Sequence, residues 1–373
     1  MRIGFDAKRA FLNNTGLGNY SRDTIRVLSN YFPDNKYFLY TPKAKENSRL
    51  SFLNSNSNTF VRTPKSLLNR ALKSYWRSKS IVKDLFTNKI DIYHGLSHEL
   101  PIGIEKTNIK TVVTIHDLIF IRYPHLFKAI DRRIYYKKFK SACERADKII
   151  AVSEQTKKDI IDFFNIPEER ITVIYQGCNK VFQSTISDEK IKNTLSKYKL
   201  PANYLLYVGT IEERKNLLTL LKTLTDLPNQ KLVVIGNGKS YKIKCLRFIS
   251  EYNLSDRVIF LSGLSLEEMS AIYQSAEIMI YPSIFEGFGI PILESLFSKT
   301  PVITSKGGCF SEAGGKHSKY INPLSVEEMK EAILEIQNST ELQNSMSENG
   351  FEFAQKFTDD KIADYLMEVY RNL

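Results

Sequence analysis

The sequence predicts an α/β protein built from two doubly wound domains. The chain has 373 residues, and one hydrophobic core seldom organises more than roughly 250–300 residues. Short runs rich in β-branched and aromatic residues recur along the whole chain, and amphipathic stretches separate most of them. Such alternation of strand and helix patterns predicts parallel sheets with helices on both faces.

The first half is predicted to form one domain over residues 1–178. Its strand-like runs are residues 2–7, 36–41, 58–63, 91–95, 111–117, 148–153 and 171–177. Helical periodicity is clearest over residues 17–31, 69–87 and 127–146. Residues 45–58 are rich in Asn and Ser without apolar periodicity, so we expect a mobile loop there.

The second half repeats the pattern and is predicted to form a domain over residues 203–355. Its strand-like runs are residues 204–210, 231–238, 257–263, 277–283 and 301–308. The polar stretch 179–202, which nearly ends at Pro201, is expected to be the linker. Residues 356–373 are expected to form a helix that packs back on the first domain, and a cleft is expected between the domains.

Charge is distributed unevenly along the chain. Up to Thr185 there are 32 Lys and Arg against 17 Asp and Glu, and the remainder has 21 against 24. A basic first half attracts nucleic acid, an anionic membrane or an anionic substrate, and charge alone does not choose among them. The content of 42% hydrophobic and 25% charged residues is typical of a folded globular protein.

No targeting or spanning segment is expected. The first residues lack the apolar run of a secretory signal, and no 18 consecutive apolar residues occur. The four cysteines lie dozens of residues apart, which favours reduced thiols over a metal site or a disulfide framework. We therefore expect a cytoplasmic protein.

The strongest local signal is a strand, a glycine loop and a helix over residues 277–299. The loop is Glu286-Gly287-Phe288-Gly289, and the helix starts near Ile290. Free backbone N–H groups and the dipole at a helix start favour an anion, and glycines allow a diphosphate to come close. Glu286 and Glu294 carry acceptor oxygens suited to sugar and ribose hydroxyls, although two solvated acids at a helix end would show the same spacing.

Several motifs together resemble a known family. Glu286 and Glu294, within EGFGIPILE, resemble the EX7E motif of retaining GT-B glycosyltransferases of family 4. YVGTIEERKNLLTLL, VVIGNG, IFLSG, RADKIIAVSEQTKKDI and ITVIYQGCN resemble further segments of that family, from about residue 2 to the carboxyl-terminal helix. The sequence of these segments is similar to that of bacterial lipopolysaccharide, O-antigen and polysaccharide sugar transferases, often mannosyltransferases. The resemblance implies a GT-B fold, with two Rossmann-like domains facing across a cleft.

The resemblance also implies roles for donor-site residues. Lys215 and Arg214 would neutralise the donor diphosphate in place of a metal ion, Glu286 would bind the donor sugar, and Glu294 would hold the ribose. The other implied donor-site positions are Gly16, Gly18, Gly209, Thr210, Gly236, Gly263, Gly287, Phe288, Gly289 and Ile290. Many relatives have Arg where this chain has Thr210, which leaves more of the diphosphate charge to Arg214. A basic loop at a solvated helix start is the alternative for Arg214 and Lys215.

The catalytic histidine implied by the resemblance is His116, at the end of the strand TVVTIHD. It would contact the donor sugar, whereas a lone histidine is otherwise more often structural. Asp117 is an acceptor-binding candidate or a helix cap. His94 is an acceptor-binding candidate at a strand end, and pairing it with His98 in a metal site is disfavoured because no acidic or Cys residue accompanies them.

The sequence thus predicts a retaining, metal-independent hexosyltransferase that needs no cofactor. The resemblance favours GDP-mannose as donor, with UDP-sugars next, and a glycan or lipid-linked acceptor. Two basic, partly apolar segments, residues 65–83 and 131–140, either contact an anionic membrane on the inner face of the plasma membrane or pack on the sheet. Alternatives are a nucleotide-sugar epimerase of GT-B fold and a basic nucleic-acid-binding protein, although no nucleic-acid-binding motif occurs.

Overall fold

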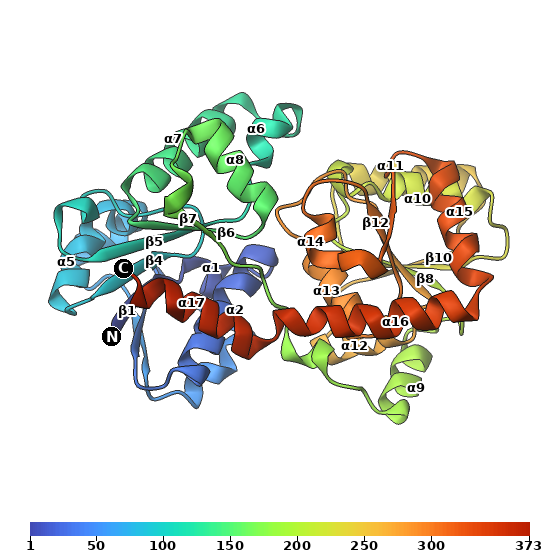
Figure 1. Ribbon diagram of the computed structural model, residues 1–373, viewed down its shortest axis with the longest axis horizontal. Helices are drawn as coiled ribbons and strands as arrows, with labels where there is room; N and C mark the ends of the chain where they lie inside the picture. The colour runs from blue at the N-terminus through green and yellow to red at the C-terminus, as the bar shows by residue number, and fades with distance from the viewer. The chain divides into compact units, whose positions relative to one another are not determined.

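The chain forms two compact units, and the computed structural model describes residues 1–373. Unit 1 contains Met1–Gln176 and Asp359–Leu373, and unit 2 contains Gly177–Thr358. Each unit is a parallel sheet surrounded by helices (Figure 1). The predicted class, an α/β protein of two doubly wound domains, is confirmed.

The sheet of unit 1 has seven parallel strands in the order β3-β2-β1-β4-β5-β6-β7. All seven runs predicted from the first half form strands. Their bounds are β1 Arg2–Asp6, β2 Lys36–Tyr40, β3 Thr59–Arg62, β4 Ile92–Gly95, β5 Lys110–Ile115, β6 Lys148–Ala151 and β7 Ile171–Val173. The order reverses between β1 and β4, and ligands of such sheets bind at the carboxyl ends of the strands at this switch point.

The helices of unit 1 cover both faces of its sheet. They are α1 Lys8–Leu12, α2 Gly16–Tyr31, α3 Leu67–Ala71, α4 Lys73–Tyr75, α5 Ile81–Thr87, α6 Ile119–Arg122, α7 Ala129–Arg145, α8 Glu154–Phe164 and α17 Asp359–Arg371. Along β2, Tyr37 packs into one apolar cluster and Phe38 into the cluster on the opposite face. A sheet covered on both faces explains why its strands are almost continuously apolar.

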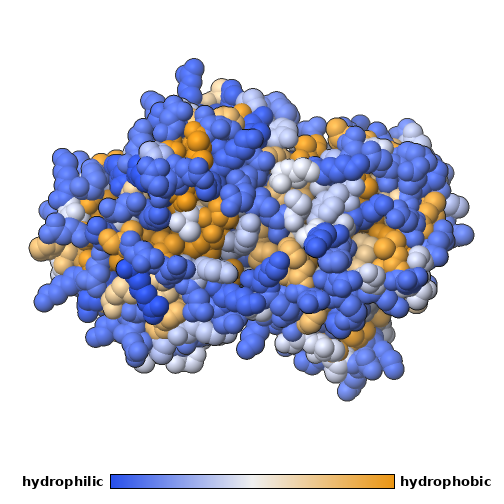
Figure 2. Space-filling view, in the orientation of Figure 1, coloured by the Kyte–Doolittle hydropathy of each residue, from blue (hydrophilic) through white to orange (hydrophobic).

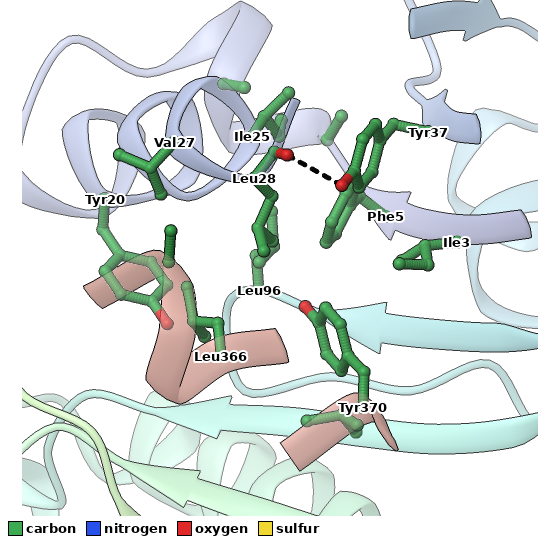
Figure 3. Close-up of a cluster of buried hydrophobic side chains, with 14 of the residues drawn as sticks. Ile3, Phe5, Tyr20, Ile25, Val27, Leu28, Tyr37, Leu96, Leu366 and Tyr370 are labelled. Atoms are coloured by element: carbon green, nitrogen blue, oxygen red, sulfur yellow. Dashed lines mark hydrogen bonds between the residues drawn. The ribbon is translucent and has the colours of Figure 1, made fainter. Parts of the chain in front are cut away.

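Helix α17 belongs to the core of unit 1. Figure 3 shows Leu366 and Tyr370 of α17 in the cluster that also holds Leu28 of α2 and Phe5 of β1. Tyr37 is a fully buried member of this cluster and donates a hydrogen bond to the carbonyl of Leu28 at 2.8 Å (Figure 3). The carboxyl-terminal helix α17 therefore completes the core of unit 1, to which the first strand β1 also belongs.

Unit 2 repeats the topology with six parallel strands in the order β10-β9-β8-β11-β12-β13. The strands are β8 Leu205–Val208, β9 Leu232–Ile235, β10 Val258–Leu261, β11 Ile278–Tyr281, β12 Val302–Ser305 and β13 Lys319–Ile321. The helices are α9 Asp188–Lys197, α10 Leu217–Thr225, α11 Ser240–Glu251, α12 Leu266–Gln274, α13 Ile290–Phe297, α14 Phe310–Gly314, α15 Val326–Gln337 and α16 Thr340–Ala354. The short strand β13 was not predicted, and the switch point lies between β8 and β11.

Residues 179–202, expected to be a linker, are folded into unit 2 instead. They contain a 3₁₀ turn, Lys180–Gln183, and helix α9. Phe182 of the turn is fully buried and meets the ring of Tyr273 edge-on at 5.5 Å. The segment reads as a linker because α9 is a solvated helix held to α12 largely by ion pairs, including Lys197 with Glu268 at 2.6 Å.

Residues 45–58, expected to be a mobile loop, also pack. They contain a 3₁₀ turn, Ser48–Asn54, in which Leu50 is buried against the core of unit 1. The Asn58 side chain donates a hydrogen bond to the carbonyl of Ser29 at 3.0 Å. Polar side chains here satisfy backbone groups, so a polar composition did not mean an absence of packing.

Candidate functional site

The switch point of unit 2 brings together two loops that the sequence singled out. Strands β8 and β11 are neighbours, with Leu206 opposite Met279, so the loops that follow them lie side by side. The N–H of Ile284 donates to the carbonyl of Arg214 at 2.8 Å, which joins the loops directly. The site is thus assembled from segments about 70 residues apart in the chain.

Three charged side chains meet between these loops. Arg214 Nη1 lies 2.6 Å and Lys215 Nζ lies 2.7 Å from the same oxygen, Oε1 of Glu286. Lys215 Nζ also donates to the hydroxyl of Tyr281 and lies 4.7 Å from the centre of its ring. Burial alone would raise the pKa of Glu286, but Lys215 and Arg214 lower it to about 2. Glu286 is therefore a carboxylate at neutral pH, and both cations are held by it.

A second carboxylate balances this charge cluster. Glu212 pairs with Arg214 Nη2 at 2.7 Å, so two cations face two carboxylates. Glu212 is more exposed than Glu286, so its pairing is more strongly screened by water. An incoming anion therefore competes mainly with Glu286.

Backbone geometry explains the glycines at the strand ends. Gly209 follows β8 with φ +151°, and a Cβ at Gly236 would lie 1.9 Å from the Gly209 carbonyl oxygen. Gly263 follows β10 with φ +74°, and Gly289 precedes α13 with φ +132°. No side chain caps the start of α13. Pro291 has no N–H and the N–H of Ile292 donates to the carbonyl of Gly289 at 2.9 Å, so it is mainly the dipole of the helix start that favours an anion there. Thr210 is exposed beside Gly209.

The rest of the glycine loop is fixed by packing. Phe288 is buried against Phe357, with ring centres 5.9 Å apart, and Cys309 Sγ lies 2.8 Å from the carbonyl oxygen of Phe288. One turn into α13, Glu294 accepts a hydrogen bond from the Tyr273 hydroxyl at 2.8 Å. The predicted donor contacts of Gly287, Phe288, Ile290 and Glu294 remain predictions.

His116 lies at the carboxyl end of β5 in unit 1 and is buried. Its Nε2 is 2.9 Å from the carbonyl oxygen of Leu96, and its Nδ1 is 3.1 Å from Gln176 Nε2. The ring therefore carries its proton on Nε2 and accepts at Nδ1. Burial and the charge of Arg9 lower its pKa to about 4, although the bond to Leu96 opposes this. His116 is neutral at neutral pH, and its predicted contact with the donor sugar remains a prediction.

His94 is part of the interior of unit 1. Its Nδ1 lies 2.6 Å from the Tyr370 hydroxyl and its Nε2 lies 2.8 Å from Thr114 Oγ1, which is 3.0 Å from the Tyr20 hydroxyl. Both ring nitrogens are taken and the side chain is fully buried. This geometry gives His94 a structural role in holding α17, and it offers nothing to the predicted acceptor.

The other candidates of unit 1 have local roles that are visible in the structure. Asp117 Oδ1 accepts from the N–H of Ile119 at 3.2 Å, but the N-cap position of α6 is Leu118, so Asp117 is not the helix cap considered as an alternative to acceptor binding. A Cβ at Gly18 would lie 1.9 Å from the Asn13 carbonyl oxygen, so close packing of α1 on α2 requires this glycine. Gly16, at the first position of α2, has open space around it.

Sequence reasoning missed several residues that complete these sites. Tyr281 and Tyr273, the partners of Lys215 and Glu294, are uncharged members of apolar runs and carried no signal of their own. Gln176, the partner of His116, lies 60 residues further along the chain. Only the pairing of strands brings such residues together.

The fold, two Rossmann-like units each built on a parallel sheet, is the GT-B architecture of glycosyltransferases. A family model described as Glycosyltransferase Family 4 matches residues 16–180, and one described as Glycosyl transferases group 1 matches residues 188–353. The chain belongs to glycosyltransferase family 4.

Two proteins with similar sequences are O-antigen mannosyltransferases. O-antigen chain mannosyltransferase RfbU of Salmonella typhimurium is 29% identical over 266 residues, which cover 71% of this chain and 69% of the relative. O-antigen chain mannosyltransferase B of Escherichia coli is 26% identical over 288 residues, 76% of this chain and 74% of the relative. The protein is a glycosyltransferase related to O-antigen mannosyltransferases, and neither the epimerase nor the nucleic-acid-binding alternative is favoured.

Solved structures share the fold over the whole chain. HepE of Anabaena, solved in complex with UDP, has a TM-score of 0.78 at 17% identity and covers 100% of both chains. WaaG, a glycosyltransferase involved in lipopolysaccharide biosynthesis, has a TM-score of 0.73 at 18% identity and covers 99% of both. At these identities the likeness shows the fold alone.

Proposed function

We propose that the protein transfers a hexose from a nucleoside diphosphate sugar to a glycan or lipid-linked acceptor, in the synthesis of a bacterial surface polysaccharide. The observation that carries the proposal is the cluster of Arg214, Lys215 and Glu286 at the switch point of unit 2. Two cations beside an uncapped helix start suit a diphosphate, and an ionised carboxylate suits sugar hydroxyls. The two mannosyltransferase relatives favour GDP-mannose, and the UDP held by HepE makes a UDP-sugar the second candidate.

The proposed reaction retains the configuration of the sugar and needs no metal ion. Arg214, Lys215 and the start of α13 stabilise the negative charge that grows on the leaving diphosphate. In this scheme Glu286 holds a sugar hydroxyl rather than attacking carbon, so the reaction does not proceed by double displacement. The acceptor hydroxyl attacks from the face that the diphosphate leaves, and the diphosphate takes the proton.

The proposal is tested by binding and by product analysis. GDP, UDP and ADP are compared by thermal shift and calorimetry, and we expect one of them to raise the Tm. Lys215→Ala removes a charge-assisted bond of about 1.5–3 kcal/mol, so affinity should fall roughly tenfold to a hundredfold. Lys222→Ala, on the exposed side of α10, is the matched control and should bind normally. NMR of the product linkage should show retention. Inversion refutes the mechanism, and failure of all three nucleotides to bind refutes the function.

We also propose that unit 1 contacts an anionic membrane. Leu67 and Leu68 of α3 are 83% and 64% exposed, and neither α3 nor α4 contains a buried residue. Ile130 of α7 is 67% exposed. Single exposed apolar side chains are ordinary, as the scattered orange in Figure 2 illustrates. Here several occur within short segments rich in Lys and Arg, which suits anionic lipid.

Two further observations refine this surface. Glu99 pairs with Arg77 at 2.9 Å and with Lys138 of α7 at 3.4 Å, so the two basic segments are neighbours in unit 1. The segment predicted as one helix over 69–87 is interrupted by a π-helical turn, Trp76–Ser80, whose Trp76 is fully buried. Trp76 and Arg77 therefore belong to the fold, and α3 and α4 form the exposed part. No helix in residues 1–373 is both long and apolar enough to cross a bilayer.

Vesicle flotation tests the membrane contact. Replacing Leu67, Leu68 and Leu72 together by Ser removes about 1.5–3 kcal/mol of burial per side chain, so binding to phosphatidylglycerol vesicles should fall at least tenfold. Leu324→Ser, at an exposed leucine of unit 2, is the control and should float normally. Wild-type binding should weaken with salt. Equal flotation of both variants would contradict the proposal.

A further inference from the structure

The switch point of unit 1 holds a second set of charged groups, distinct from the cluster in unit 2. Asp6 ends β1, and α1 begins two residues later with Lys8 and Arg9. The adjacent strand β4 is followed by the loop that contains Ser97 and Glu99. This place in unit 1 corresponds to that of the Arg214, Lys215 and Glu286 cluster in unit 2, because both sheets reverse their strand order there.

The two carboxylates of this set already form ion pairs within unit 1. Arg77 holds Asp6 with Nη2 at 2.7 Å and Glu99 with Nη1 at 2.9 Å. Lys138 lies 3.4 Å from the other oxygen of Glu99. Neither Lys8 nor Arg9 makes an ion pair or a side-chain hydrogen bond anywhere in residues 1–373, although both are half-buried. Four cations therefore face two carboxylates, and the two unpaired cations are neighbours.

The electrostatics agree with a shortage of negative charge. Burial lowers the pKa of Lys8, and the charges of Arg77 and Arg9 lower it further, against the opposing effect of Asp6 and Glu99. Arg9 also acts on the two buried histidines at the strand ends, since its charge lowers the pKa of both His98 and His116. A bound anion would reverse the unfavourable effect on Lys8.

An independent sign of a missing ligand is the Ser97 hydroxyl. Ser97 is buried in the loop after β4, and its Oγ has no hydrogen-bond partner. Most buried hydroxyls are satisfied, so an unpaired one calls for an explanation such as a bound polar group. Ser97 precedes His98, on which the charge of Arg9 acts. His98 next to it holds φ +64°, a conformation that residues with a side chain seldom adopt.

We propose that Lys8 and Arg9 bind a phosphate or diphosphate group carried by the acceptor. The inference rests on the proposed function, because it gives the anion to the acceptor once unit 2 has the donor diphosphate. A dianionic group matches the excess of two positive charges, and the side chains of Lys8 and Arg9 supply several donors to its oxygens. The exposed basic surface of α7 is linked to the same cluster through Glu99, so a phosphate at the head of a membrane-anchored acceptor fits this place.

The test uses inorganic pyrophosphate as the probe and the full chain, with unit 2 saturated by the nucleoside diphosphate that binds it. Binding is followed by calorimetry and ³¹P NMR. Lys8→Gln and Arg9→Gln should each weaken pyrophosphate binding tenfold or more, and Arg9→Lys should recover part of the loss. Lys36→Gln is the matched control, because Lys36 is exposed at the opposite, amino end of β2.

A second measurement separates an acceptor phosphate from bulk lipid phosphate. The same variants should float with phosphatidylglycerol vesicles as the wild type does, because a half-buried site does not contact the general membrane surface. Loss of both pyrophosphate binding and flotation would assign Lys8 and Arg9 to the lipid-contact surface and overturn the proposal. Unchanged pyrophosphate binding would overturn it as well. Failure of nucleotides to bind unit 2 is a different result, which refutes the donor site and leaves the pyrophosphate measurement valid.

Discussion

Glu286 has two tasks that cannot be performed at once with the same oxygen. In the structure its Oε1 neutralises both Arg214 and Lys215. In the proposed function a donor diphosphate binds the same two cations, and its arrival displaces the carboxylate. The freed carboxylate can then accept a hydrogen bond from the sugar. The charge cluster is therefore arranged to exchange one anion for another.

This exchange predicts opposite effects of one substitution. Glu286→Gln removes the competing charge and keeps the shape, so affinity for the nucleoside diphosphate should rise by roughly threefold to tenfold. Transfer should fall at least a hundredfold, because a neutral amide holds the sugar less well. Calorimetry and a transfer assay measure the two quantities. Glu294→Gln is the matched control, and there the nucleotide should bind more weakly. Weaker nucleotide binding by Glu286→Gln would show that no competition exists.

At the residue scale, the sequence predicted which residues lie at the site better than it predicted which atoms they contact. Arg214, Lys215 and Glu286 could be found because each lies in a short motif at a strand end. The sequence could not show that both cations contact one oxygen, because this contact depends on the pairing of β8 with β11. Lys8 and Arg9 lie in no recognisable motif. Their proposed anion-binding role could be inferred only from the folded unit, in which neither side chain has a carboxylate partner.

At the scale of elements, α17 shows how a distant segment is fixed to unit 1. Arg26 of α2 donates to both carboxylate oxygens of Asp359, at 2.6 and 3.1 Å, and Tyr370 at the other end of α17 contacts His94. The helix is thus held at both ends by polar contacts and along its length by Leu366 and Met367.

Asp359→Ala should destabilise unit 1. Arg26 would lose its main partner while remaining largely buried, at a cost of about 2–3 kcal/mol. Urea unfolding measures the loss, with the fluorescence of Trp76, the only tryptophan, as a probe of unit 1. Asp364→Ala, on the exposed side of the same helix, should change the free energy of unfolding by less than about 0.5 kcal/mol. Similar losses in both variants would mean that the ion pair contributes little.

Elements with strong apolar periodicity were the most predictable. All strand-like runs form strands, because buried parallel strands are apolar on both faces. Helix α9, the 3₁₀ turn at Ser48–Asn54 and the broken helix over 69–87 were not predicted correctly. In each case the boundaries depend on a few buried side chains, such as Phe182, Leu50 and Trp76, that carry no periodic signal.

For the whole molecule, the buried histidines predict that unit 1 is sensitive to mild acid. Burial lowers the pKa of His94 to about 3 and, with Arg9, that of His116 to about 4. In the unfolded chain both titrate near 6.5, so below that pH the unfolded state binds more protons and stability falls. The loss is roughly 5 kcal/mol for His94 and roughly 3 kcal/mol for His116, complete once the pH reaches the folded pKa of each. The loss therefore develops between pH 6.5 and about 3–4.

Unit 2 should respond at lower pH. Its two most depressed carboxylates are Glu286 and the more exposed Glu268, each with its pKa lowered to about 2, so their contribution is present above pH 4.5 and is lost as the pH falls toward about 2. In moderate urea, Trp76 fluorescence should therefore change at higher pH than the part of the far-UV circular dichroism signal that belongs to unit 2. Coincident transitions would contradict independent titration of the two units.

The discontinuity of unit 1 has a consequence for biosynthesis. Unit 2 is one uninterrupted segment, Gly177–Thr358, whereas unit 1 needs Asp359–Leu373 to complete its interior. On the ribosome, the unit that begins first is therefore finished last, and its apolar surface waits for a chaperone or for α17. A premature stop codon shortly before Asp359 would leave unit 2 intact and would expose unit 1 to proteolysis.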